Sequence, residues 1–462
     1  MHILFVVRDL HTEYLGIMSL SSILKRAGHN IDIVEARYDR IKRKLEKNNF
    51  TILAYSAHVV NISYYLNLNR KIKEEFNVFS VFGGPLPTLS PEIINKPGVD
   101  GVCIGEGEYA LLGLVNNLAE GKSITNIANW WIKKEGQIFR SSSGPLIKDL
   151  DTLPFVDRTL FHITYEMFIL TSRGCPYRCS YCSERNEFRR RSVDNVIEEL
   201  REVKSSTHAR FLRFVDSTFN ISLPWLREFS EKYKKEIGLP FCCNVRADLV
   251  TPESIKCLKE AGCFFVSMGI ETANDYLRNE VLKKDLTKEQ IISAIEIIKR
   301  YKLRLLTYNM LCIPFSSLED DLETLRLNIQ CRPDYATASL FFIHKHTDIY
   351  NSLVKYSRFK HLETTLRGGD FHINLELQDC AHKLRNIKNL RKLFCLAVEF
   401  PFLLPLISFL KKLPLFWFYS FLDLLWEGYC YYFRLSGRYV LGRKNFTILL
   451  KRRLKKMLWL GG

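Results

Sequence analysis

Several common sequence signals are missing from this chain of 462 residues. It has neither an internal repeat of solenoid length nor a low-complexity segment, which excludes a repeat array. No apolar run reaches the roughly 20 residues of a membrane-spanning helix. The apolar start ends at Arg8 and Asp9, too early for a secretory signal peptide. We therefore expect a cytosolic chain whose 13 cysteines are buried small hydrophobes or metal ligands rather than disulfides.

Acidic residues are fewer than basic ones, 50 Asp and Glu against 67 Lys and Arg, and the net charge is +17. Residues 371–462 hold 16 of the basic and 5 of the acidic residues, a net charge of +11. Such a basic segment favours an anionic partner, a membrane or a nucleic acid, and a solvated basic face is the alternative. We expect no nucleic acid, because charge alone points to one and no RNA-binding module is recognisable.

Aromatic and aliphatic residues are dense in 394–426, and 451–459 combines basic with apolar residues. These segments suit the interfacial layer of a membrane. The alternative is a helical cap that buries the aromatic side chains on the preceding domain. We therefore predict a helical C-terminal region at 351–462, either free in the cytosol or peripheral at the inner face of the membrane.

Apolar strands and amphipathic helical patterns alternate through the first 140 residues. The expected strands are 3–7, 31–35, 51–56, 78–84 and one that begins at 101. This pattern predicts a Rossmann-like, doubly wound parallel sheet, whose ligands bind at the carboxyl ends of the strands. Small or turn-forming residues fall at those ends: Ser56, Gly83, Gly84, Pro85, Gly105, Glu106 and Gly107. They do not form the dinucleotide fingerprint G-x-G-x-x-G, and ordinary tight turns would also explain them.

Residues 141–164 are polar and are predicted to be a linker. A second βα series spans 165–350, with expected strands at 167–173, 210–217, 241–248, 263–271, 304–314 and 335–343. Six parallel strands with crossover helices predict a partial (β/α)6 barrel. Asp216, Arg246 and Glu271 stand at strand ends and would face one mouth of this barrel.

Cys175, Cys179 and Cys182 lie in the stretch TSRGCPYRCSYC, at the spacing C-x3-C-x2-C. Three thiolates leave one iron of a four-iron cluster without a protein ligand, and an open metal position can bind a substrate or cofactor. A structural zinc site would need a fourth ligand, and no further cysteine or histidine is near in the sequence. The pattern therefore predicts an open iron–sulfur site.

The stretch CPYRCSYC resembles the C-x3-C-aromatic-C motif of the radical S-adenosylmethionine (SAM) enzymes. The segments 215–219 and 244–272 resemble strands of that family's cobalamin-binding, class B methyltransferase-like branch. Upstream, YLGIMSLSSILKRAGH, FGGPLPT and DGVCIGEGE resemble its N-terminal cobalamin-binding domain, which would span 1–140. The resemblance covers most of the chain.

The resemblance implies that Cys175, Cys179 and Cys182 hold a [4Fe–4S] cluster and that SAM binds its open iron. One electron would cleave SAM to a 5′-deoxyadenosyl radical, which needs a dry, closed pocket. The residues implied around SAM are Tyr181 by the adenine, Asp216 near the ammonium, and Arg246 and Glu271 near the carboxylate and ribose. The alternatives are that Asp216 is a strand-end cap and that Arg246 and Glu271 form an ion pair.

For the cobalamin, the resemblance places Leu15 and Gly16 toward the corrin ring. It places Ser56, Gly83, Gly84, Pro85 and the Gly105–Glu106–Gly107 loop around the nucleotide tail. Leu86 stands where a histidine is usual. His11 is in a D-x-H context with Tyr14 where a glycine is expected, so we interpret it as an ordinary loop histidine.

Two segments depart from the family pattern on the substrate side. Cys312–Ser317 replaces the usual G-x-P-G-E-T, and His344–Tyr350 replaces a P-G-T element. We interpret these changes as a changed substrate rather than a partial loss of activity, because the cluster motif is whole. Core packing is the simpler explanation for Tyr308 and Cys312.

The resemblance thus implies a cobalamin-dependent radical SAM enzyme that methylates an unactivated carbon of a small molecule. The hydrophobic and basic C-terminal region indicates a lipid-like substrate. It would receive electrons from a reductant protein such as a flavodoxin or ferredoxin. The alternatives are a non-methylating cyclisation or rearrangement with the same cofactors, and a non-catalytic corrin- or cluster-binding sensor.

Overall fold

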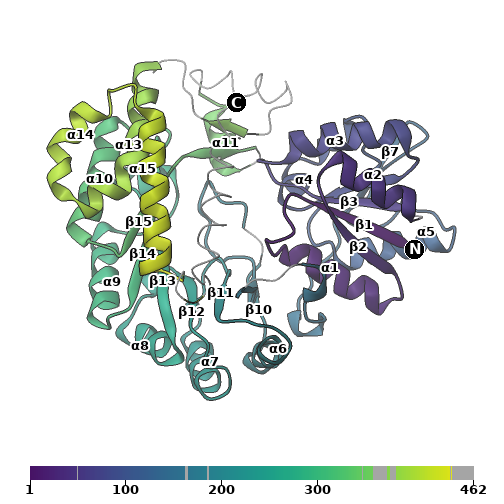
Figure 1. Ribbon diagram of the computed structural model, residues 1–462, viewed down its shortest axis with the longest axis horizontal. Helices are drawn as coiled ribbons and strands as arrows, with labels where there is room; N and C mark the ends of the chain where they lie inside the picture. The colour runs from purple at the N-terminus through teal and green to yellow at the C-terminus, as the bar shows by residue number, and fades with distance from the viewer. Residues whose placement is uncertain are drawn as a thin grey trace. The chain divides into compact units, whose positions relative to one another are not determined.

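The chain divides into two compact units in the computed structural model (Figure 1). Unit 1 comprises Met1–Ile163 and Arg189–Arg191, and unit 2 comprises Thr164–Phe188 and Ser192–Gly462. The structure describes residues 1–48, 50–161, 165–184, 187–345, 347–356, 372–374, 381–436 and 439.

Unit 1 is built on a seven-stranded sheet of order β2-β1-β3-β4-β5-β6-β7. Its parallel part consists of β1 (His2–Val7), β2 (Asn30–Glu35), β3 (Ile52–Ser56), β4 (Phe79–Gly83) and β5 (Gly101–Cys103). The helices between and after these strands are α1 (Leu15–Arg26), α2 (Tyr38–Lys47), α3 (Ile62–Glu75), α4 (Pro85–Leu89), η1 (Pro91–Asn95) and α5 (Glu108–Ala119). The predicted doubly wound parallel sheet is confirmed.

The sheet of unit 1 is extended by an antiparallel hairpin that was not predicted. It consists of β6 (Trp130–Lys134) and β7 (Gln137–Arg140), and β6 also pairs antiparallel with β5. Its two-residue turn, Glu135-Gly136, has φ of 50° and 78°. Positive φ at both positions is the geometry of a type I′ hairpin turn, which matches the twist of the flanking strands.

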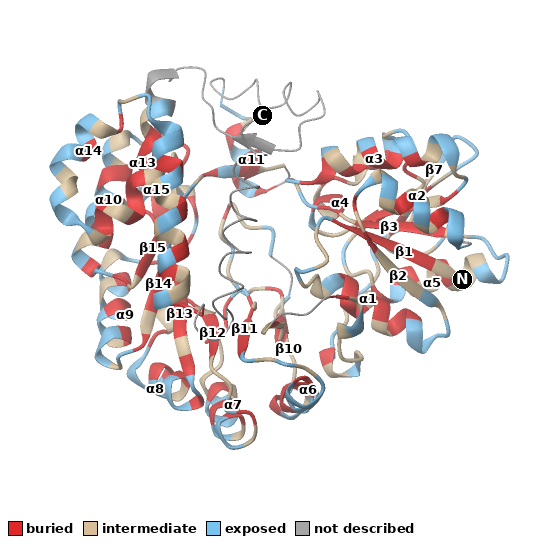
Figure 2. Ribbon diagram, in the orientation of Figure 1, coloured by how far each residue is buried: buried red, intermediate tan, exposed pale blue. Residues whose placement is uncertain are grey.

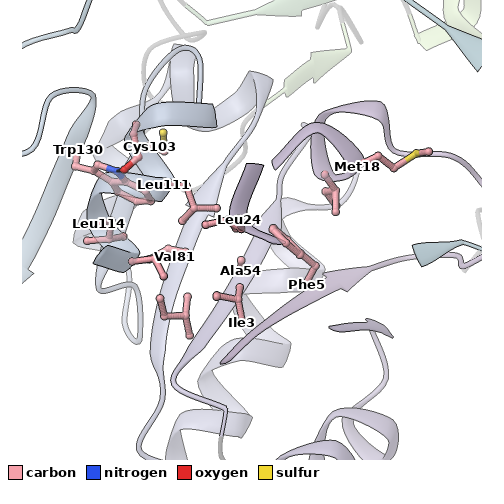
Figure 3. Close-up of a cluster of buried hydrophobic side chains, with 14 of the residues drawn as sticks. Ile3, Phe5, Met18, Leu24, Ala54, Val81, Cys103, Leu111, Leu114 and Trp130 are labelled. Atoms are coloured by element: carbon pink, nitrogen blue, oxygen red, sulfur yellow. Dashed lines mark hydrogen bonds between the residues drawn. The ribbon is translucent and has the colours of Figure 1, made fainter. Parts of the chain in front are cut away.

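The core of unit 1 joins the sheet to α1 and α5 (Figure 3). Ile3, Phe5 and Val81 extend from the strands, and Leu114 comes from α5. The indole of Trp130 is fully buried, and its Nε1 donates to the carbonyl of Ala110 at 2.8 Å. A buried indole needs such an acceptor, so this bond fixes how the hairpin packs on α5.

The polar segment after the hairpin lies on unit 1 and includes η2 (Leu150–Thr152) and η3 (Arg158–Leu160). Asp157 accepts from Ser21 Oγ at 2.6 Å and pairs with Lys25 at 2.7 Å. Arg158 pairs with Glu13 at 2.7 Å. Asp157 and Arg158 thus fasten the end of this segment to α1 and to the loop before it.

Unit 2 is built on a six-stranded parallel sheet of order β15-β14-β13-β12-β11-β8. The strands are β8 (Glu166–Ile169), β11 (Phe211–Phe214), β12 (Phe241–Val245), β13 (Cys263–Glu271), β14 (Arg304–Leu311) and β15 (Tyr335–Leu340). The crossover helices are α6 (Val193–Ser206), α7 (Leu223–Glu236), α8 (Pro252–Ala261), α9 (Lys288–Arg300) and α10 (Leu318–Cys331). Shorter elements are β9 (Ser172–Arg173), β10 (Arg189–Arg190, assigned to unit 1), η4 (Ala247–Leu249) and η5 (Leu277–Val281). The six predicted parallel strands and their crossover helices are confirmed, and the strands are largely buried (Figure 2).

The C-terminal region is helical, as predicted. Its elements are β16 (Phe342–His344), α11 (Asp348–Leu353), β17 (His372–Asn374), α13 (Ala381–Glu399), η7 (Pro401–Leu403), α14 (Leu404–Leu410), α15 (Phe416–Tyr429) and η8 (Cys430–Arg434). Leu390 and Phe394 of α13 are fully buried against α10 and β15. Among the described residues, no helix has the length and apolar character to cross a bilayer. The basic stretch 451–459 lies outside the described residues.

Candidate active site

The three cysteines lie on the loop that follows β8 and β9, at the carboxyl end of an edge strand of unit 2. Ser180, between Cys179 and Cys182, is buried and ties this loop to two other elements. Its N–H and Oγ donate to the carbonyls of Leu282 and Val281 at 2.8 and 2.6 Å, and its carbonyl accepts from Ile349 N at 3.0 Å. The loop is therefore anchored at its centre while the cysteine side chains are half-buried.

The cysteine thiols influence one another electrostatically. Burial raises the pKa of Cys179, and Lys284 and Arg246 oppose that rise while Glu271 and Cys175 add to it. Burial also raises the pKa of Cys182, and Cys179 and Cys175 add to it. Iron binds the thiolate, so a bound cluster must supply the charge that deprotonates these thiols.

The donor set suits a cluster better than a single ion. Within the described residues, no three His, Cys, Asp or Glu side chains are arranged to hold one metal ion. A four-iron cluster binds each thiolate to a different iron, so its ligands need not converge on one point. The spacing on one loop, the half-burial and the two nearby cations fit a [4Fe–4S] cluster held by Cys175, Cys179 and Cys182.

Asp216 follows β11 and is fully buried at the carboxyl edge of the sheet. Its carboxylate accepts hydrogen bonds from Thr171 N at 3.1 Å, from Thr171 Oγ1 at 2.8 Å and from Ser172 Oγ. Its main-chain carbonyl accepts from Asn244 Nδ2 at 2.9 Å. The side chain thus holds the start of the cysteine loop, which is the strand-end role considered as the alternative to contact with SAM.

Arg246 follows β12 and is also buried. Its guanidinium lies over the ring of Tyr177 at 3.6 Å, and its Nε is 2.9 Å from Asp248 Oδ1. Its Nη2 donates to the carbonyl of Lys284. Tyr177 lies between Cys175 and Cys179, so this stacking brings a positive charge to the cysteine loop.

Glu271 ends β13 in a conformation that its sequence did not predict. The pairing of β13 with β14 shifts register between Gly269 and Glu271, and Glu271 has a left-handed φ of 66°. This bulge turns the carboxylate back over Gly269, where a Cβ would lie only 2.1 Å from Glu271 Oε1. Strained backbone of this kind persists where the surrounding structure holds it, and it is common at functional sites.

The Glu271 carboxylate is paired with Lys284 rather than with Arg246. Lys284 Nζ lies 2.7 Å from Glu271 Oε1, and both side chains are nearly buried. Tyr181 donates its OH to the same oxygen at 3.3 Å, and its ring packs edge-on to Phe341 at 6.3 Å. Burial, followed by the charge of Glu271, raises the pKa of Tyr181 well above its ordinary value.

The structure therefore gathers the predicted unit 2 residues at the carboxyl ends of four neighbouring strands. Sequence reasoning missed Lys284, Thr171, Ser172 and Gly269. Tyr177 was also missed. It lies inside the cysteine motif, and Thr171 and Ser172 lie just before it, so the motif itself could have pointed to these three residues. Lys284 carried no such signal, because it comes from an irregular segment after η5.

In unit 1, the predicted glycine-rich turns meet at one edge of the sheet. Ser56 is in register with Gly83, and Gly84 has a left-handed φ of 101°. A Cβ at Gly84 would lie 3.2 Å from Ser56 Oγ and from the Ala57 backbone. Gly105 N donates to Thr88 Oγ1 at 3.0 Å, which ties the third turn to the second. These turns bring glycines and main-chain atoms together at one edge of the sheet, as close contact with a large cofactor requires.

The other residues predicted to contact cobalamin differ in exposure and in contacts. Leu15 and Gly16 begin α1, and a Cβ at Gly16 would meet open space. Pro85 begins α4 and is exposed, whereas Leu86 is buried, so it offers no polar contact. His11 is exposed in a loop where its N–H donates to Asp9, as expected of an ordinary loop histidine.

Glu106, at the centre of the Gly105–Gly107 turn, makes strong contacts within unit 1. Its carboxylate lies 3.0 Å from Arg189 Nη1 and accepts from Ile147 N at 2.7 Å. Arg189 is buried and follows Cys182 by seven residues. The turn predicted to hold the nucleotide tail is therefore held by two contacts within unit 1, an ion pair with Arg189 and a hydrogen bond from Ile147.

On the substrate side, the structure corrects one expectation. Tyr308 is 40% exposed on β14, so it is not packed in the core. Cys312 and Phe315 have left-handed φ of 61° and 70°, at the positions where the family motif has glycine. Phe315 is exposed, and its ring meets that of Tyr356 edge-on at 5.5 Å.

Comparison with known proteins agrees with this geometry. A B12 binding domain family model matches residues 1–115, and a radical SAM superfamily model matches residues 169–327. An uncharacterized methyltransferase of Pyrococcus horikoshii is 28% identical over 344 residues, which cover 70% of this chain and 74% of that protein. The anaerobic magnesium-protoporphyrin IX monomethyl ester cyclase of Rubrivivax gelatinosus is 24% identical over 393 residues, which cover 76% and 70%.

The fold is also found in a solved structure. The radical SAM methyltransferase TsrM of Kitasatospora setae, with cobalamin and a [4Fe–4S] cluster bound, superimposes with a TM-score of 0.66 at 16% identity. The match covers 77% of this chain and 78% of that one. Both family models match in the order that the two units have along the chain. The chain therefore combines an N-terminal B12 binding domain with a radical SAM domain, and the cofactors of these two domains are cobalamin, a [4Fe–4S] cluster and SAM.

Proposed function

We propose that this enzyme cleaves SAM reductively and methylates an unactivated carbon of a small-molecule or lipid-like substrate. The observation that carries the proposal is the cysteine loop, with Arg246 and the Glu271–Lys284 pair beside it at one edge of the unit 2 sheet. Bound at these sites, the cluster and SAM would supply a 5′-deoxyadenosyl radical and the corrin would carry the methyl group.

The side chains of this edge have separate tasks in the proposal. Cys175, Cys179 and Cys182 hold the cluster and leave one iron open to SAM. Asp216 positions the cysteine loop through Thr171 and Ser172. In this proposal Asp216 acts as a positioning residue, and contact with the SAM ammonium is the alternative.

Three further groups are proposed to surround SAM. Arg246 and Lys284 add positive charge beside Cys179 and favour both the thiolate and an anionic ligand group. Glu271 is held by Lys284 and Tyr181, which leaves its second oxygen for a ribose hydroxyl. Tyr181, packed against Phe341, offers a ring face to the adenine.

Unit 1 is proposed to hold the cobalamin at its glycine-lined edge. Ser56 and Gly83 to Pro85, with Gly105 to Gly107, would surround the nucleotide tail, because a backbone without bulky side chains admits it. Leu15 and Gly16 would face the ring from the start of α1. No side chain is assigned as the lower cobalt ligand.

Methylation is favoured by the methyltransferase name of the Pyrococcus relative. A ring closure with the same cofactors is the second candidate, because the Rubrivivax relative is named a cyclase. The lipid-like substrate, and with it peripheral contact with the membrane, is proposed from the exposed aromatic side chains of the C-terminal region. A protein reductant of the flavodoxin or ferredoxin class would supply the electron.

The test is anaerobic. The protein is reconstituted with iron, sulfide and cobalamin, SAM and a reductant are added, and 5′-deoxyadenosine and retained corrin are quantified. A variant with Cys175→Ala, Cys179→Ala and Cys182→Ala is the control, and it should retain corrin but form no 5′-deoxyadenosine. A wild-type protein that carries the cluster and SAM yet gives no 5′-deoxyadenosine, with lipid extracts present, would overturn the proposal.

A further inference from the structure

The C-terminal helices carry several exposed apolar side chains. We define the docking face by six of them: Phe402, Leu406, Phe409, Trp417, Phe418 and Phe421. Each is between 44% and 71% exposed. They come from η7, α14 and α15, and all six lie within the 20 residues 402–421. Isolated exposed apolar residues are normal on a protein surface, but six of them within one short stretch of helices, five of them aromatic, point to an interaction site.

The opposite sides of the same helices are firmly packed, so the exposure is not a result of loose ends. Ile407 of α14 and Tyr419 of α15 are buried in the cluster that α13 forms with β15. Tyr419 OH donates to the carbonyl of Leu410 at 3.0 Å. Asn389 of α13 donates to the carbonyls of Lys411 and Leu413 at 2.9 and 2.8 Å. Both helices are therefore held in place from inside while their outer sides stay apolar.

The described charges from α13 to α15 include two paired acids, an exposed lysine and Glu427. Asp423 is paired with Lys392 at 3.0 Å, and Glu399 is paired with Arg434 at 2.6 Å. Lys412, between α14 and α15, is exposed. The sequence adds further basic residues in this region, which contribute to its net charge of +11 between 371 and 462. With Asp423 and Glu399 each paired to a cation, Lys412 exposed and a sequence charge of +11 in this region, an anionic partner is favoured over a cationic one.

We propose that the docking face binds the headgroup layer of an anionic lipid bilayer, with α14 and α15 lying in the plane of the membrane. Aromatic rings with adjacent lysines are the composition of interfacial helices. A second copy of the chain fits less well, because two such faces packed together would oppose their positive charges. This inference rests on the proposed function in one respect, since it names the place where a lipid-like substrate would be met.

The first test is flotation of the full-length chain with vesicles. One set is phosphatidylcholine alone, and the other contains phosphatidylcholine and phosphatidylglycerol in equal amounts. We expect binding to the anionic vesicles, weakened by salt, and little binding to the neutral ones. Flotation needs neither cluster nor SAM, so its failure is distinguishable from a failure to form 5′-deoxyadenosine. Absence of binding to either vesicle would overturn the inference.

Variants assign the binding to the face. Trp417→Ser should reduce the bound fraction, and the combination Phe409→Ser, Trp417→Ser and Phe421→Ser should weaken partitioning about tenfold or more. Tyr276→Ser is the matched control, because Tyr276 is an equally exposed aromatic residue outside the C-terminal region. Circular dichroism and corrin retention check that each variant is folded.

Two outcomes of these variants would contradict the inference. One is equal flotation of the triple variant and the wild type. The other is a wild-type chain that dimerises in light scattering, ignores vesicles and becomes monomeric in the triple variant. The second result would assign the face to another copy of the chain.

Discussion

Replacing Gly269 tests the geometry of the Glu271–Lys284 ion pair most directly. A Cβ there would lie 2.1 Å from Glu271 Oε1 and 2.9 Å from Lys284 Nζ. Carbon and oxygen atoms do not approach so closely, so Gly269→Ala must displace the carboxylate. The displaced group is half of a nearly buried ion pair. Loss of one partner of a buried pair costs about 3–5 kcal/mol, and we expect Gly269→Ala to lower the free energy of unfolding by roughly that amount.

A double-mutant cycle isolates the collision from other effects. In a Glu271→Ala background the carboxylate is gone, and the remaining neighbour, Lys284 Nζ, is the flexible end of a long side chain. Gly269→Ala should then cost about 1 kcal/mol or less, which gives a coupling free energy of about 2 kcal/mol or more. Urea unfolding followed by circular dichroism measures each corner. Gly113→Ala, in the middle of α5 with only an ordinary contact to Ile127, is the control and should stabilise.

The same series reports on function. Gly269→Ala should weaken SAM binding to the reconstituted protein, measured by calorimetry under anaerobic conditions, while iron content stays unchanged. An equal cost of Gly269→Ala in both backgrounds would refute the reasoning, because the collision would then not involve Glu271. Unaltered SAM affinity in Gly269→Ala would show that the Glu271–Lys284 pair is not part of the SAM site.

Three further predictions concern the same unit. Burial raises the pKa of Asp321 to about 7, so between about pH 4 and pH 7 the native state holds a proton that the unfolded state has lost. The free energy of unfolding should therefore fall as the pH rises through this range. Asp321→Asn should abolish that fall, as measured by urea unfolding at each pH. Phe315→Gly should stabilise the chain by about 1 kcal/mol in urea unfolding, because φ is left-handed there, and a loss of stability would contradict this. Asp216→Ala should lower the free energy of unfolding by about 3 kcal/mol, since Thr171 and Ser172 lose their hydrogen-bond acceptor. It should also reduce the iron content of the reconstituted protein without reducing bound corrin. Full iron content in this variant would show that the cysteine loop does not need Asp216.

Much of the fold could be predicted because its signals are local. Thr251 caps α8, Pro252 begins it and Gly262 ends it with a left-handed φ, and all three are start and stop signals that a sequence displays. The β6–β7 hairpin was missed although its signal was present. Glu135-Gly136 separates two strand-like runs by two residues, which is a recognised hairpin pattern.

The candidate site divides in the same way. The cysteines and the strand-end residues follow from motifs and from the topology of a parallel sheet. The partner of Glu271 does not, because Lys284 lies 13 residues further along, after the irregular η5 segment. Its position depends on the β13 bulge and on how η5 folds back, and both are tertiary effects without a sequence period. The strand-end role of Asp216 likewise depends on Thr171 and Ser172, which are 45 and 44 residues distant in sequence.

The departures from the family pattern at Cys312–Ser317 can now be interpreted physically. The usual glycines allow left-handed backbone, and here Cys312 and Phe315 adopt that backbone with side chains attached. The Cys312 N–H donates to the buried Asp321 carboxylate at 3.1 Å, so the turn is held from α10. The turn is therefore retained at an energetic cost, and the change is confined to what protrudes from it: an exposed phenyl ring beside Tyr356. A preserved strained turn that carries a new apolar side chain supports an altered substrate preference over a loss of activity.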